Sequence, residues 1–210
     1  MRLHEHMMLL YCVRPLLQAP SLKPPAAACH LTARDSLQLD AKVASAGSSS
    51  ICAALAGLGQ LSAKPSTLMA NTLVIKTQQQ LAAAPTVHTS APAMLPGGLP
   101  AADLAAAAWA LAAAELRLPP SWSAAATAHL AAAAAVLPPR ALLQTVFAAA
   151  SWRIKLPKQL LQAVQGLDQQ QLQARQLLPP QQLSTVASAL LAAGQAVPQA
   201  LVTHLPESAA

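Results

Sequence analysis

Residues 99–119 read LPAADLAAAAWALAAAELRLP, and this stretch decides the fold because it encloses one helix-length segment between two Leu-Pro steps. Similar steps recur through the second half of the chain, at Leu99-Pro100, Leu118-Pro119, Leu137-Pro138, Leu156-Pro157, Leu178-Pro179 and Val197-Pro198. Their intervals are 19, 19, 19, 22 and 19 residues. Proline lacks a backbone N–H and fits best in the first turn of a helix, so each step predicts the end of a connection and the start of a helix. Two such helices form a hairpin of about 38 residues, within the range of helical repeats.

Two further segments follow the same pattern, over residues 137–157 (LPPRALLQTVFAAASWRIKLP) and 178–198 (LPPQQLSTVASALLAAGQAVP). Each places a leucine at its sixth position, and the residues four and seven further on complete one face of a helix. The three stripes are Leu104, Ala108 and Leu111; Leu142, Val146 and Ala149; and Leu183, Ala187 and Leu190. The longer interval of 22 residues predicts an insertion at the glutamines 169–171, near a kink at Gly166, in a second helix over 158–177.

These patterns predict an all-α protein, a short right-handed α-solenoid of helical hairpins with a largely disordered N-terminal region. Residues 1–46 are expected to be a disordered or presequence-like leader, and 47–81 a degenerate helical pair. Residues 82–98 form a Pro/Gly-rich linker, and 99–210 the helical-repeat domain, with units starting at 99, 137 and 178. Alanine is the most frequent of the hydrophobic residues, which make up 54% of the chain, and only 2% of all residues are aromatic, so the core should be thin.

Few residues offer catalytic chemistry. The seven acidic residues are scattered, no Gly-rich phosphate loop occurs, and the three cysteines (Cys12, Cys29 and Cys52) lack the spacing of a zinc site or a disulfide framework. We therefore expect no enzyme activity, no cofactor, no metal site and no small-molecule substrate, and we expect reduced thiols. The longest apolar run, residues 121–137, is too short for a membrane span and reads as a soluble helix, so no membrane partner is expected.

The basic residues lie at repeated positions of a chain whose net charge is +6. Arg117 and Lys155 each stand one residue before a Leu-Pro step, so stacked repeats would place them along one edge. Further cations in or near the turns between helices are Arg140, Arg153, Lys158 and Arg175. Such a row can follow the phosphates of single-stranded RNA, but cations are also ordinary at helix C-termini, and both readings stay open.

The aromatic residues divide by position. Trp109 and Phe147 lie inside the first helices and are expected in the core, as is Trp122 near the start of a second helix. Trp152, beside Arg153 at a helix end, is equally compatible with the core and with an exposed platform on which an unpaired base stacks.

The segment from Leu99 through Trp109-Ala110-Leu111 to Pro119-Pro120-Ser121-Trp122 resembles the octotricopeptide repeat, and the resemblance covers about residues 99–205. It implies a helical-repeat protein related to the repeats of RAP-domain proteins, which binds RNA and acts in organellar RNA stability, processing or translation. It also implies a chloroplast or mitochondrion, with the cytoplasm as the other possibility. The alternatives are a protein-interaction scaffold, which would use the exposed repeat end, and a truncated fragment of a longer repeat protein.

Overall fold

The structure, a computed structural model, describes residues 46–60, 64–83, 94, 98–167 and 178–202. Within these ranges the protein is all-α, as predicted, and its regular elements are helices. The predictions that concern the leader, the glutamines 169–171, Arg175 and most of the linker lie outside the described residues, as do Cys12 and Cys29.

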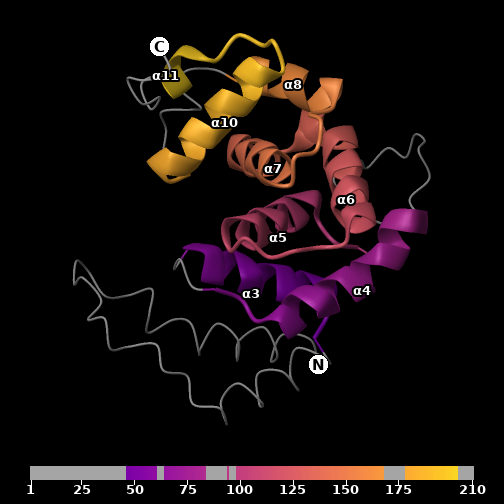
Figure 1. Ribbon diagram of the computed structural model, residues 1–210. Helices are drawn as coiled ribbons and strands as arrows, with labels where there is room; N and C mark the ends of the chain where they lie inside the picture. Colours follow the sequence, from indigo (N-terminus) through magenta and orange to yellow (C-terminus); the bar gives the residue numbers. More distant parts are fainter. Residues whose placement is uncertain (1–45, 61–63, 84–93, 95–97, 168–177, 203–210) are drawn as a thin grey trace, which may run out of the picture.

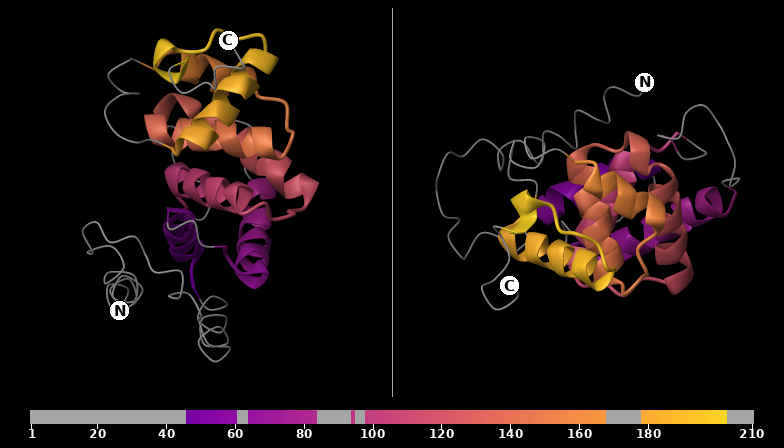
Figure 2. Two further views of the ribbon diagram at one scale, coloured as in Figure 1. Left: turned by 60° about the vertical axis from the view of Figure 1, so that its left-hand side comes forward. Right: turned by 90° about the horizontal axis from the view of Figure 1, so that it is seen from above.

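The helices form two parallel rows. The first helices of the hairpins are α3 (Ser48–Gln60), α5 (Ala101–Ala113), α7 (Pro139–Ser151) and α10 (Pro180–Ala192). The second helices are α4 (Thr67–Ala83), α6 (Pro120–Ala132) with the 3₁₀ turn η1 (Ala134–Val136), α8 (Lys158–Gln165) and α11 (Gln199–Val202). Figure 1 shows α3, α5 and α7 stacked in order, with α10 beyond α7 and with α4, α6 and α8 along one side. The left view of Figure 2 shows the same order. In the first row each helix from α3 to α10 packs on the next, and in the second row α4 packs on α6 and α6 on α8, while α11 packs on α10.

The Leu-Pro steps start the helices, as predicted. Prolines 100, 119, 138, 157 and 179 are the N-cap residues of α5, α6, α7, α8 and α10. The leucine before each proline is then at N′, and the fifth residue after that leucine is at N4, which is the spacing of a hydrophobic staple. Both members are buried in four of the five pairs: Leu99 and Leu104, Leu137 and Leu142, Leu156 and Leu161, and Leu178 and Leu183.

The second helices α6 and α8 end in different ways. The second helix between the steps Leu118-Pro119 and Leu137-Pro138 is α-helical from Pro120 to Ala132 and then tightens into η1. Of the helix expected over 158–177, the described part runs to Gln165 and has Gly166 as its C-cap, while residues 168–177 lie outside the described residues. Glycine weakens a helix interior relative to alanine, which favours the end of the helix here.

All three predicted stripes are buried, as are Trp109, Phe147 and Trp122. The Trp122 indole Nε1–H donates to the Thr77 hydroxyl at 2.8 Å, which joins α6 to α4. The Trp109 Nε1–H donates to the Gln182 side-chain oxygen at 2.6 Å, which joins α5 to α10. Tryptophans therefore connect both neighbouring and non-neighbouring helices of the stack.

The helical pair α3–α4 belongs to the same core as the later hairpins. A Cβ added to Gly59 would lie 2.8 Å from the Ala110 Cβ and 2.8 Å from the Trp109 Cζ3, so α3 and α5 touch closely at this point. Gly59 is near the C-terminus of α3, and Ala110 is near that of α5. The two helices therefore run in the same direction, as first helices of successive repeats do.

Candidate nucleic-acid interface

Three first helices end in the same motif. After α5, the N–H of Leu116 donates to the Leu111 carbonyl and that of Glu115 to the Ala112 carbonyl, which is a Schellman motif. The same pair of bonds closes α7 at Arg153 and Ile154. It also closes α10, at Gly194 and Gln195. The chain therefore leaves each of these helices by the same turn, and the residues that follow reach repeat-equivalent positions.

The turn residue itself adopts the left-handed conformation at each site. Its φ is 55° at Glu115, 57° at Arg153 and 71° at Gly194. Glycine takes this conformation freely, whereas an L-residue pays about 1–2 kcal/mol for it. Two charged residues thus occupy positions where glycine is more stable.

A row of cations runs along the edge where the first helices end. Arg117 and Lys155 each lie two residues before the N-cap of the following second helix. Lys64 has the same position before α4, because the Ser66 hydroxyl accepts from the Met69 N–H and so caps that helix. We call these three residues the cation row. Each is exposed, and none forms an ion pair within the described part of the chain.

Sequence reasoning missed Lys64, because the α3–α4 pair lacks the Leu-Pro step. The signal that could have found it is Lys64-Pro65 itself, a cation directly before a proline at the start of a helix. The equivalent position before α11 is Ala196, so the row covers three successive hairpins and ends at the fourth.

The other predicted RNA-binding residues divide between two edges. Arg153 and Lys158 lie in the α7–α8 connection and at the start of α8, so both are exposed on the edge of the cation row. Arg140 is exposed near the start of α7, about 20 Å from that edge for a helix of this length. The structure therefore separates Arg140 from the others.

The N-termini of α6 and α8 face the same edge. Their N-caps are Pro119 and Pro157, and neither helix has a side-chain capping bond. Residue 120 at the start of α6 is a proline without an N–H, and the Trp122 N–H donates to the Pro119 carbonyl, but the N-terminus of each helix still carries a partial positive charge. These charges reinforce the positive potential of the cation row.

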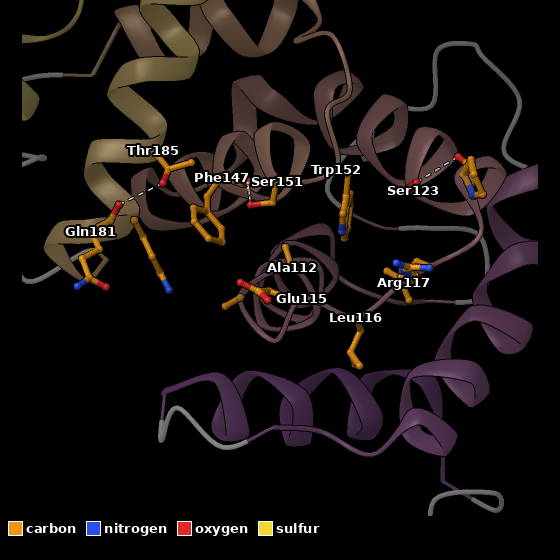
Figure 3. A pocket seen from close by; sticks show the side chains of 14 residues that line it. Ala112, Glu115, Leu116, Arg117, Ser123, Phe147, Ser151, Trp152, Gln181 and Thr185 are labelled. Atoms are coloured by element: carbon orange, nitrogen blue, oxygen red, sulfur yellow. Dashed lines mark hydrogen bonds between the residues drawn. The ribbon is translucent and has the colours of Figure 1, made fainter. Parts of the chain in front are cut away.

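A groove of about 830 Å³ opens beside the cation row, between the ends of α5 and α7 and the start of α10. Figure 3 shows Glu115 and Leu116 at the end of α5, with Phe147 and Gln181 on the opposite wall and Trp152 pointing into the groove near Arg117. The hydroxyls of Ser151 and Thr185 also line it, but each donates to a carbonyl of its own helix.

Trp152 is partly buried, between the two alternatives that its sequence position allowed. Its ring packs edge-to-face on the buried ring of Trp122, with centroids 5.9 Å apart and an interplanar angle of 72°. Its indole Nε1 is buried and has no hydrogen-bond partner. Trp152 is thus a wall of the groove rather than a free platform.

Two titratable groups elsewhere in the described residues have shifted pKa values. Burial, reinforced by the nearby charge of Asp103, raises the pKa of Cys52 to about 12, so this thiol is free, neutral and buried. Burial lowers the pKa of His129, whose Nε2 has no hydrogen-bond partner. Neither residue lines the groove.

Among the described residues, no group of three or more His, Cys, Asp and Glu side chains could hold a metal ion. Among the described helices, none is both long enough and apolar enough to cross a membrane.

Comparison with protein families, with curated proteins and with solved structures gave no match to this chain.

Proposed function

We propose that this protein is a right-handed α-solenoid of hairpins of about 38 residues that binds single-stranded RNA along the edge where its first helices end. The observation that carries the proposal is the cation row. Lys64, Arg117 and Lys155 hold one structural position in three successive hairpins, and each is exposed without an ion pair in the described residues. Packed helices lie about 8–10 Å apart, so the row presents a charge at regular steps to a phosphate backbone.

Two further features support RNA over a generic acidic partner. The N-termini of α6 and α8 at the same edge carry a partial positive charge that suits phosphate oxygens. The adjoining groove offers aromatic side chains and polar groups, which suit the unstacked bases of a single strand. The resemblance of residues 99–122 to the octotricopeptide repeat agrees with this function, and we propose a chloroplast or mitochondrion as its location.

Fluorescence anisotropy with a labelled single-stranded RNA of about 20 nucleotides tests the proposal. Three phosphate contacts predict a plot of log affinity against log salt with a slope of about −2. Reversing two charges together, in the variant Arg117→Glu/Lys155→Glu, should abolish binding. Arg140→Glu is the control, because it reverses a charge at the opposite end of α7 and should leave binding nearly unchanged.

Unchanged binding by the double variant, or an equal loss in Arg140→Glu, would refute the cation row as the contact. A scaffold for protein partners is the second candidate, supported by Leu191 and Val202, which are 48% and 43% exposed on the last hairpin. That function predicts no RNA retention and loss of a partner on Leu191→Glu, so the same RNA measurement separates the two.

A further inference from the structure

Glu115 is the least expected residue of the groove. It lines the groove, is exposed, and makes no ion pair within the described residues. It also has a left-handed backbone conformation directly after the C-cap of α5, at the position that Gly194 occupies after α10. Strained non-glycine residues of this kind are concentrated at functional sites. Arg153 occupies the equivalent left-handed position after α7, but of the two only Glu115 lines the groove.

The side-chain NH₂ group of Gln182 is a hydrogen-bond donor, and the bond between Gln182 and the buried Trp109 determines how the amide is oriented. The indole N–H of Trp109 can only donate, so the atom that it meets at 2.6 Å must be the side-chain oxygen of Gln182. The NH₂ group of the same amide therefore points away from that bond, and Gln182 lines the groove. The residues that line the groove thus include Glu115, whose carboxylate has two acceptor oxygens, and Gln182, whose NH₂ group takes no part in the bond to Trp109.

The remaining walls suit a flat ring. Phe147 and Trp152 give the groove aromatic surface, and Figure 3 shows both directed into it. Arg117, a member of the cation row, lines one end. A base held in the groove would therefore have its phosphate beside the row. A volume of about 830 Å³ leaves room for one nucleotide together with water.

We infer that the groove holds one base of the bound RNA and prefers guanine; this inference rests on the proposed function. Guanine presents two adjacent donors, N1–H and N2–H, which match the two oxygens of the Glu115 carboxylate. Its O6 is an acceptor, which matches the NH₂ of Gln182. Adenine, cytosine and uracil each lack the adjacent pair of donors, so they leave the carboxylate partly unpaired.

Four labelled RNAs of about nine nucleotides test the inference, each a run of uridines with guanine, adenine, cytosine or uracil at the centre. One bidentate contact predicts that the guanine probe binds roughly tenfold more tightly than the others. A single guanine also avoids the folded structures that runs of guanine form.

The decisive variant is Glu115→Gln, which keeps the size of the side chain but replaces one acceptor by a donor. The ratio of guanine to uracil affinity should fall to about one, while the uracil probe still binds. Asp103→Asn is the matched control, because it removes the same charge at the start of α5 and should leave the ratio of guanine to uracil affinity unchanged. The Ser49 hydroxyl donates to the Asp103 carboxylate at 3.1 Å, and asparagine retains an oxygen that can accept this bond.

Equal binding of all four probes by the native protein, or a guanine preference that survives Glu115→Gln, would overturn the base site and leave the proposed function standing. Failure to bind any of the probes would overturn both.

Discussion

The contact between α3 and α5 provides the sharpest test of the fold, through two glycines of one helix. Gly59 and Gly57 both lie in the last turns of α3, so either Gly→Ala change raises helix propensity by up to about 1 kcal/mol. A Cβ at Gly57 meets nothing within 4 Å. One at Gly59 meets the Ala110 Cβ and the Trp109 ring at 2.8 Å and the Ala110 Cα at 3.2 Å.

Carbon atoms pack at about 3.5–4.0 Å, so Gly59→Ala overlaps its neighbours by close to 1 Å. Overpacking of this size costs about 1–3 kcal/mol, and the backbone atom among the contacts favours the upper value. After the gain in helix propensity, Gly59→Ala should lower the free energy of unfolding by about 2 kcal/mol. Gly57→Ala should raise it by up to about 1 kcal/mol.

Thermal unfolding followed by circular dichroism should show Tm lower by about 4–8 °C for Gly59→Ala and higher by about 2–4 °C for Gly57→Ala. Tryptophan fluorescence adds a local readout, because the Trp109 ring is one of the groups displaced. If Gly59→Ala is as stable as the native protein, α3 does not pack on α5 as described, and the hairpin α3–α4 is not part of the stack.

Two further predictions concern strain and charge. Glu115→Gly relieves the left-handed backbone and should stabilise the protein by about 1 kcal/mol, whereas Gly194→Ala should destabilise it by a similar amount. Urea unfolding measures the change in the free energy of unfolding for both variants. Glu115→Gln should show no gain in stability. If it gains as much stability as Glu115→Gly, the effect comes from the charge of Glu115 and not from its backbone conformation. His129 has a lowered pKa in the folded state, so its contribution to stability is complete above its ordinary pKa of 6.5 and is lost as the pH falls through the folded value. The difference in unfolding free energy between the native protein and His129→Gln should therefore change between about pH 7.5 and about pH 5.5, and a constant difference would contradict the burial of His129.

Much of the fold could be predicted because its signals are local. Proline fixes φ and lacks an N–H, so the Leu-Pro steps mark helix starts without reference to the rest of the chain. The stripes of Leu104, Leu142 and Leu183 follow from the period of one helix. The cation positions at Arg117 and Lys155 followed from counting residues to the same prolines.

The candidate site was less predictable. Lys64 becomes part of the cation row only when α3–α4 is seen to stack on α5, and no Leu-Pro step announces that hairpin. Gln182 and Trp109 are 73 residues apart, and only their hydrogen bond shows that the side-chain oxygen of Gln182 is occupied, which leaves its NH₂ group to donate elsewhere.

The sequence by itself determined where helices begin, which faces are apolar and which residue types recur at each turn. These properties depend on interactions within one or two helical turns. The tertiary structure alone decided that α3 joins the stack, that Trp152 packs on Trp122, and that Glu115 is held in a left-handed conformation at the edge of a groove. Each of these depends on contacts or backbone geometry that the packed helices impose, and the same apolar pattern is compatible with several such arrangements.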